Sequence, residues 1–249
     1  MKIQRIHIDV FRAPIEKQVV TSFGTIPSRA MGTLRLEDSD GVIGWGDIWG
    51  NFPTITTEYR AKLAATLLPK ELIGATISSP GAFTQELARK FHILKVQASE
   101  HGPVNGVLAA INQALWDLNA RKQGKPLRQL LNPAAADTVP AYGSGLNPSD
   151  CVEVTERARA EGYQAFKLKF GFGANVDRRN LEALRAGMKP RERLFVDANQ
   201  CWSLAEARAA IPMLVDTSVE WFEEPMVATT PIEQWKALAA ECPVPLAGG

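Results

Sequence analysis

The second half of the chain alternates short apolar runs with helical stretches, and this pattern restricts the fold most. From residue 138 onward we predict strands at residues 139–142, 165–170, 194–197, 219–223 and 244–247. The predicted helices between them cover residues 150–161, 176–187, 203–215 and 231–240. Strands that alternate with helices form a parallel sheet with helical crossovers. These units are too few to close an eight-stranded barrel, so we expect the N-terminal part of a longer protein.

Charged residues stand at the ends of three of these strands. Lys167 and Lys169 lie in the first, and Asp197 comes 28 residues after Lys169. Glu223 follows Asp197 by 26 residues, which again is about one strand–helix unit. In a (β/α) barrel the carboxyl ends of the strands carry the active site. We therefore expect these side chains to meet in one site.

The two lysines are two residues apart in a strand, so both point to the same face. Neighbouring ammonium groups repel each other, which lowers their pKa and makes a neutral amine available as a base. Solvated lysines on an edge strand are the alternative, but a barrel strand has no solvated face. Lys167 and Lys169 therefore need charged partners.

Asp197 and Glu223 supply such partners. Two carboxylates at successive strand ends fit a hard divalent cation such as Mg²⁺ or Mn²⁺. Asn199 faces the same way as Asp197, and we expect it to bind a ligand or a lysine. Glu224 points the other way, and we expect it to support the site from the loop. Asp197 taken alone would be compatible with a helix cap.

The first half predicts a small antiparallel sheet followed by helices. The expected strands cover residues 3–11, 31–36 and 42–45, and the last two form a hairpin. Loops are expected at residues 19–29 and 49–54, and helices at residues 56–68, 80–96 and 104–121. Gly124 and Pro126 end the third helix. We place the domain boundary there, which gives domains 1–125 and 126–249.

Five motifs together resemble the enolase superfamily, in particular its mandelate racemase/muconate lactonizing branch. They are Lys167-x-Lys169, Val-Asp-Ala-Asn-Gln at 196–200, Glu-Glu-Pro at 223–225, Pro-Leu-Ala-Gly-Gly at 245–249 and Ala-Leu-Trp-Asp-Leu at 114–118. The resemblance runs over essentially the whole chain. It implies an α+β capping domain followed by the first part of an α/β (β/α)₇β TIM-type barrel.

The resemblance also implies an essential Mg²⁺ that binds a small carboxylate substrate, and homo-oligomers. A base would remove the proton alpha to the carboxylate, and the metal would stabilise the enediolate. Carried over by position, Asp197 and Glu223 are metal ligands and Lys169 is the acid/base. Lys167 would tune Lys169 or touch the substrate carboxylate. The third metal ligand would be the residue after Gly249.

Two polar segments match the loops of the family's capping domain that close over the substrate. A hydroxylated acid needs polar contacts there, which Thr21, Ser22, Thr25, Arg29 and Asn51 offer. These residues are therefore candidates for contacting the substrate.

Three functions remain open from the sequence. The Ala-Gly-Gly ending at 247–249 is closer to the acid-sugar dehydratase and mandelate racemase side of the family, which favours an Mg²⁺-dependent lyase that dehydrates a sugar acid. A racemase, epimerase or cycloisomerase that begins with the same proton abstraction is the alternative. A truncated relative without catalytic activity is the third.

The composition excludes other classes of partner. Lys and Arg number 28 against 27 Asp and Glu, so we expect neither nucleic acid nor an anionic membrane surface as a partner. No apolar run approaches the ~20 residues that a spanning helix needs. The three cysteines have the spacing of neither a zinc site nor a disulfide framework, which favours the reducing cytoplasm.

Overall fold

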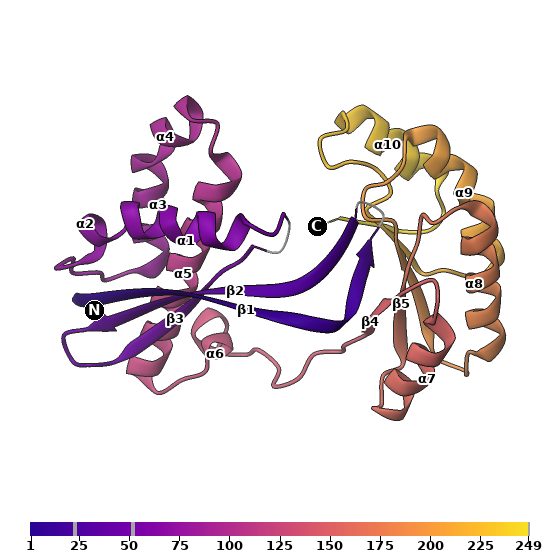
Figure 1. Cartoon of the computed structure of the whole chain (residues 1–249). Helices are drawn as coiled ribbons and strands as arrows, with labels where there is room; N and C mark the ends of the chain where they lie inside the picture. Colours follow the sequence, from indigo (N-terminus) through magenta and orange to yellow (C-terminus); the bar gives the residue numbers. More distant parts are fainter. Residues whose placement is uncertain (22–23, 51–52, 249) are drawn as a thin grey trace. The chain divides into compact units, whose positions relative to one another are not determined.

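The computed structural model describes residues 1–21, 24–50 and 53–248 (Figure 1). The chain divides into two compact units. One consists of Met1–Lys17 and Ile26–Asp137, and the other of Gln18–Thr25 and Thr138–Gly249. Each unit has its own cluster of buried hydrophobic side chains.

The first unit is built on a three-stranded sheet in the order β1-β2-β3. The strands are β1 (Ile3–Thr21), β2 (Gly24–Asp38) and β3 (Ile43–Ile48). β2 pairs with β3 antiparallel, with Leu34 opposite Gly46. Side chains alternate between the faces, and Leu34, Leu36 and Ile48 are fully buried in the core of this unit.

The loop predicted at residues 19–29 is wrong, because β1 extends to Thr21 and β2 already begins at Gly24. The β-branched residues in this segment favour extended backbone and outweigh its glycine and proline. β3 pairs only with residues 32–37 of β2, so Pro27 lies outside this pairing. A missing N–H at Pro27 therefore costs no hydrogen bond to β3.

Helices follow this sheet in the chain and pack on β3 and on one another. They are α1 (Thr56–Leu67), α2 (Pro69–Leu72), α3 (Pro80–Lys90), α4 (His92–Gln97), α5 (His101–Gln123) and α6 (Leu127–Leu131). The single helix predicted at residues 80–96 is wrong, since the backbone leaves helical geometry at Phe91. At this break the Phe91 side chain is buried in the core of the unit. α5 ends at Gly124 in the left-handed conformation, as predicted.

The second unit confirms the predicted parallel sheet with helical crossovers. Its strands pair in the order β4-β5-β6-β7-β8: β4 (Gly143–Leu146), β5 (Ala165–Lys169), β6 (Arg193–Asp197), β7 (Trp221–Glu223) and β8 (Leu246–Ala247). The connecting helices are α7 (Cys151–Ala160), α8 (Ala174–Gly187), α9 (Leu204–Asp216) and α10 (Ile232–Glu241). Such a sheet corresponds to part of a TIM barrel.

The first strand of this sheet lies later than predicted. Residues 139–142 were expected to form it, but β4 begins at Gly143. Val139, which suggested a buried strand, is 82% exposed. The apolar run therefore belongs to the segment that leads into the sheet, and the prediction of a strand there is wrong.

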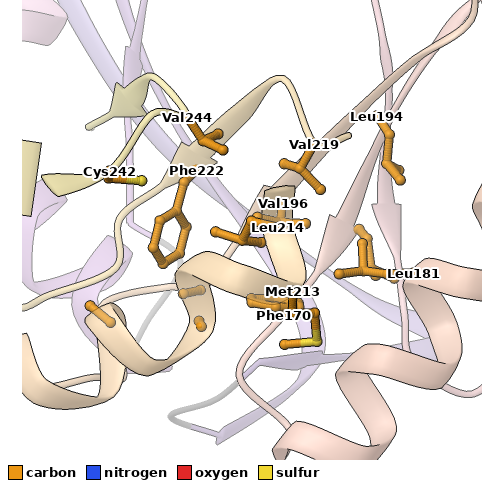
Figure 2. Close-up of a cluster of buried hydrophobic side chains, with 14 of the residues drawn as sticks. Phe170, Leu181, Leu194, Val196, Met213, Leu214, Val219, Phe222, Cys242 and Val244 are labelled. Atoms are coloured by element: carbon orange, nitrogen blue, oxygen red, sulfur yellow. The ribbon is translucent and has the colours of Figure 1, made fainter. Parts of the chain in front are cut away.

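Alternate residues of the parallel strands face the helices. Leu194, Val196 and Phe222 from the strands pack with Leu181 of α8 and Leu214 of α9 in one core cluster (Figure 2). The residues between them therefore lie on the opposite face of the sheet. Within the described ranges, none of the helices has the length and apolar character that a membrane span requires.

Candidate active site

The register of the parallel strands brings the predicted charged residues side by side. Lys169 on β5 is the pairing partner of Asp197 on β6, which in turn pairs with Glu223 on β7. All three end their strands on the face opposite the helices. The Lys169 Nζ atom lies 2.6 Å from Asp197 Oδ2. A cation and two carboxylates are thus gathered at the carboxyl edge of the sheet.

Asn199 belongs to this group. Its Oδ1 atom accepts a hydrogen bond of 2.8 Å from Lys169 Nζ, and its backbone N–H donates to Asp197 Oδ1 at 2.9 Å. The Lys169 ammonium is therefore held between Asp197 and Asn199. The sequence predicted that Asn199 binds either a ligand or a lysine, and the structure shows the contact with a lysine.

Lys167 lies one step deeper in the same strand. Its side chain is buried, and its Nζ donates to Glu223 Oε1 at 2.7 Å and lies 3.7 Å from Asp197 Oδ2. Burial lowers the pKa of Lys167, but the hydrogen bond to Glu223, contributions from Tyr142 and the charge of Asp197 together raise the pKa above its usual value. The lowered pKa predicted for this lysine is therefore wrong.

An aromatic layer lies beside Lys167. The rings of Phe195 and Trp221 stack with centroids 3.7 Å apart, and Tyr142 meets both rings edge-on at 5.7 and 5.3 Å. The Lys167 Nζ atom lies 5.2 Å from the centre of the Tyr142 ring, within the range of a cation–π contact.

This aromatic layer was not predicted from the sequence. Phe195 and Trp221 each stand two residues before a site carboxylate, so a period of two in the strands would have placed them on the same face. Tyr142 precedes β4, and no local pattern distinguishes it.

Glu224 takes part in a different set of contacts. Its Oε1 atom accepts a hydrogen bond of 3.2 Å from Gln200 Nε2. Together with residues such as Trp235 of α10, Glu224 and Gln200 line a pocket of about 460 Å³. Glu224 therefore supports the loops around the charged residues and has no described contact with Lys167 or Lys169.

The five candidates for substrate contact are described only in part. Ser22 and Asn51 lie outside the described residues, and Thr21 is the last residue of β1. Thr25 and Arg29 are exposed on β2. Their contact with a substrate stays a prediction.

The donor set at the strand ends fits a hard cation. Asp197 and Glu223 are adjacent in register and offer anionic oxygen atoms, which Mg²⁺ and Mn²⁺ prefer. Within the described part of the chain, no group of three or more His, Cys, Asp or Glu side chains is arranged to hold a metal ion. Among the described residues, Asp197 and Glu223 therefore remain a pair of candidate ligands.

Comparisons with known proteins cover both units. The family model of the mandelate racemase / muconate lactonizing enzyme N-terminal domain matches residues 5–132, and a model described as enolase C-terminal domain-like matches residues 150–249. The D-galactarolactone cycloisomerase of Agrobacterium fabrum is 28% identical over 258 residues, which cover 100% of this chain and 65% of that enzyme. Other curated relatives are named as epimerases, racemases and o-succinylbenzoate synthases.

Solved structures are similar over the whole chain. The crystal structure of a mandelate racemase/muconate lactonizing enzyme from Bordetella bronchiseptica gives a TM-score of 0.91 at 37% identity and covers 100% of this chain and 65% of that one. A racemase from Streptomyces coelicolor with bound magnesium gives 0.88 at 26% identity, covering 99% and 69%. The chain spans less than two thirds of the length of the curated cycloisomerase that it matches.

Proposed function

Because the chain belongs to the mandelate racemase/muconate lactonizing enzyme family of the enolase superfamily, we propose that it removes the proton alpha to the carboxylate of a small acid with the help of a divalent metal ion. One observation carries the proposal. Lys169, Asp197 and Glu223 end neighbouring strands in register, with the lysine nitrogen 2.6 Å from an Asp197 oxygen. A base therefore lies directly beside Asp197, and Glu223 is the neighbour of Asp197 on the next strand.

Asp197 and Glu223 are the residues that would hold Mg²⁺, and Mn²⁺ suits the same donors. When bound, the ion neutralises the negative charge that develops on the carboxylate oxygen atoms of an acid as its α-proton leaves. The magnesium bound to the Streptomyces coelicolor racemase supports this assignment. Both carboxylates sit on strands, so their positions vary less than those of loop residues.

Lys169 is the proposed acid/base. Its Nζ atom is fixed by two acceptors, Asp197 Oδ2 and Asn199 Oδ1, which orients the amine toward the carboxyl edge of the sheet. In the neutral form it accepts the α-proton, and in the protonated form it returns a proton to the same carbon or to a leaving hydroxyl.

Lys167 has a different proposed role. Its raised pKa keeps it protonated, and it faces Glu223 at 2.7 Å. A fixed positive charge there balances the two carboxylates and favours binding of an anionic substrate near Lys169. The Lys167 cation is thus an electrostatic group, whereas Lys169 transfers the proton.

Two outcomes can follow the shared first step. Dehydration of a sugar acid follows if the β-hydroxyl leaves, and this is the reaction favoured by the ending at residues 247–249. Racemisation or epimerisation follows if the same intermediate is reprotonated on the opposite face of the α-carbon, and cycloisomerisation follows if a ring bond of the substrate forms or breaks. The names of the curated relatives support this second class. The two proposals share Lys169, Asp197 and Glu223 and differ in the product.

Proton NMR in D₂O tests the proposal. The 249-residue chain is incubated with Mg²⁺ and a panel of hydroxy acids, sugar acids and sugar lactones, and the C2 proton signal is followed. We expect at least one acid to lose this signal. A keto acid that has lost water identifies a dehydratase, and an isomer of unchanged mass identifies a racemase, epimerase or cycloisomerase. A panel without any exchange would contradict the proposal.

A further inference from the structure

The backbone just after β6 and β7 has an uncommon conformation. Asn199, Gln200 and Glu224 all have positive φ angles, of 48°, 63° and 42°. Residues other than glycine rarely adopt this left-handed conformation, which persists where surrounding contacts hold it. Asn199 and Gln200 follow Asp197 closely, and Glu224 is next to Glu223. The strain therefore lies directly beside both proposed metal ligands.

Gln200 makes three of the hydrogen bonds that join these two segments. Its backbone N–H donates to the carbonyl oxygen of Glu224 at 2.7 Å, and its Nε2 atom donates to Glu224 Oε1 at 3.2 Å. Its Oε1 atom accepts a hydrogen bond of 2.9 Å from the N–H of Ala228. Both ends of the side-chain amide are thus used, and both bind the segment that follows β7.

The regular pairing of the two strands ends before this point. Asp197 and Glu223 are the last residues of β6 and β7 in register, and the Ala198 N–H donates to the Glu223 carbonyl oxygen at 3.0 Å. Beyond it the backbone contacts are fewer: the Gln200 N–H bonds to Glu224, the Trp202 N–H donates to the Pro225 carbonyl oxygen at 3.1 Å, and an isolated bridge pairs Trp202 with Met226. The Gln200 side chain adds two hydrogen bonds to these contacts, within three residues of one carboxylate and beside the other.

We propose that Gln200 is a positioning residue for the metal site: by joining the segments after β6 and β7 it sets the separation of the Asp197 and Glu223 carboxylates. This inference rests on the proposed function, because it assumes that these carboxylates bind a divalent cation. Side chains that orient metal ligands without touching the metal typically change metal affinity 10- to 100-fold when they are replaced. A purely structural role would change stability and leave the affinity unaltered.

The affinity of the full chain for Mn²⁺, measured by electron paramagnetic resonance of the free ion, tests the inference. Gln200→Leu removes both side-chain hydrogen bonds without adding charge, and we expect its dissociation constant to rise about tenfold or more. Gln200→Asn keeps the amide but shortens the side chain, so its Mn²⁺ dissociation constant should also rise. This variant replaces Gln200→Leu in the test if the leucine variant does not fold. Dissociation constants equal to the wild-type value in these variants would overturn the inference.

A swapped pair provides the rescue. In Gln200→Glu/Glu224→Gln the carboxylate at position 200 accepts hydrogen bonds from the Ala228 N–H and from the amide placed at position 224. The net charge equals that of the wild type, so electrostatic attraction of Mn²⁺ is matched. We expect a dissociation constant within about threefold of wild type. A loss as large as that of Gln200→Leu would overturn the inference.

Asp197→Asn separates this inference from the proposed function. We expect it to abolish Mn²⁺ binding. A wild-type chain that binds no Mn²⁺, or an Asp197→Asn variant that binds it normally, overturns the metal site and the positioning role together. Loss of binding in Asp197→Asn with normal binding in the Gln200 variants overturns the positioning role alone.

Discussion

The ion pair between Arg159 and Glu192 joins α7 to the turn before β6. Two parallel hydrogen bonds connect them, from Arg159 Nε to Glu192 Oε1 at 2.6 Å and from Nη2 to Oε2 at 2.8 Å. Their side chains are only 10% and 5% exposed. The hydrogen bond from Arg159 lowers the pKa of Glu192 below its usual value. Without Glu192, the buried Arg159 charge would keep, among the described residues, only the exposed Glu156 carboxylate as an acidic partner.

Replacing Glu192 tests how much this ion pair contributes to stability. We expect Glu192→Gln to lower the free energy of unfolding at pH 7 by roughly 3 kcal/mol, measured by urea denaturation. Since the folded-state pKa of Glu192 is lowered, the pair contributes fully above the unfolded pKa of ~4.3 and loses its contribution as the pH falls through the folded pKa. The difference between variant and wild type should therefore shrink in acid.

An exposed pair provides the control. Glu220 bonds to Arg193 at 2.7 Å, but the two side chains are 40% and 57% exposed. Glu220→Gln should change the free energy of unfolding by less than about 1 kcal/mol. Equal effects at positions 192 and 220, or a Glu192→Gln effect independent of pH, would contradict the account of the buried pair.

The charged residues of the site could be predicted because each follows from local spacing. Lys169, Asp197 and Glu223 end successive strands, and the period of the units brings them to one edge. The pKa of Lys167 could not be predicted in the same way, because it depends on Glu223, 56 residues away in the chain. The contact between Gln200 and Glu224 is equally non-local and was not predicted.

At the scale of elements, α5 packs directly on the backbone of β3. A Cβ atom at Gly46 would lie 2.0 Å from the Ala110 carbonyl oxygen, and one at Gly44 would lie 2.2 Å from that of Ala114. The Trp45 N–H of this edge strand donates to Asp117 Oδ2 on the same helix. The helix therefore covers the edge of the sheet, which blocks pairing with other strands.

This contact predicts that Gly46→Ala destabilises the protein by about 1–3 kcal/mol, because the atoms that the new methyl group would meet belong to the backbone of α5. Thermal and urea unfolding measure the change. Gly102→Ala, on the exposed side of α5 with no atom within 4 Å of the added Cβ, is the matched control and should not destabilise the protein. Equal losses of stability in Gly46→Ala and Gly102→Ala would contradict the close packing of α5 on β3.

Elements with a strong hydrophobic period could be predicted closely, and those without it could not. The strands β5 and β6 and the helices α7 to α10 lie within two residues of their predicted positions. β4, with the sequence Gly-Ser-Gly-Leu, has almost no apolar side chains, so its position comes from pairing with β5. The long hairpin of β1 and β2 likewise depends on pairing across the sheet.

At the scale of the whole molecule, the two units have separate cores, and the proposed metal ligands lie in the second. The domain boundary predicted between residues 125 and 126 stays a prediction. So do the third metal ligand after Gly249, the homo-oligomer and the cytoplasmic location. This chain covers only 65% of the curated cycloisomerase, so the activity of the whole protein also stays a proposal.

Metal binding to the intact chain should appear in its thermal unfolding. A ligand that binds only the folded state stabilises it by about 2.7 kcal/mol at 100 times its dissociation constant. We therefore expect Mg²⁺ to raise the unfolding midpoint of the wild type and to leave that of Glu223→Gln unchanged. A wild-type midpoint that does not respond to Mg²⁺ would favour the third hypothesis, a relative without catalytic activity.

The most direct test of the central claim is the rate at which the α-proton of a substrate acid exchanges with D₂O. It is measured by NMR for the wild type, for Lys169→Ala and for Lys236→Ala, which removes an exposed lysine of α10. We expect Lys169→Ala to lower the exchange rate at least about a hundredfold, the usual contribution of a positioned acid or base, and Lys236→Ala to leave it unchanged. Undiminished exchange in Lys169→Ala would contradict the claim that this lysine abstracts the proton.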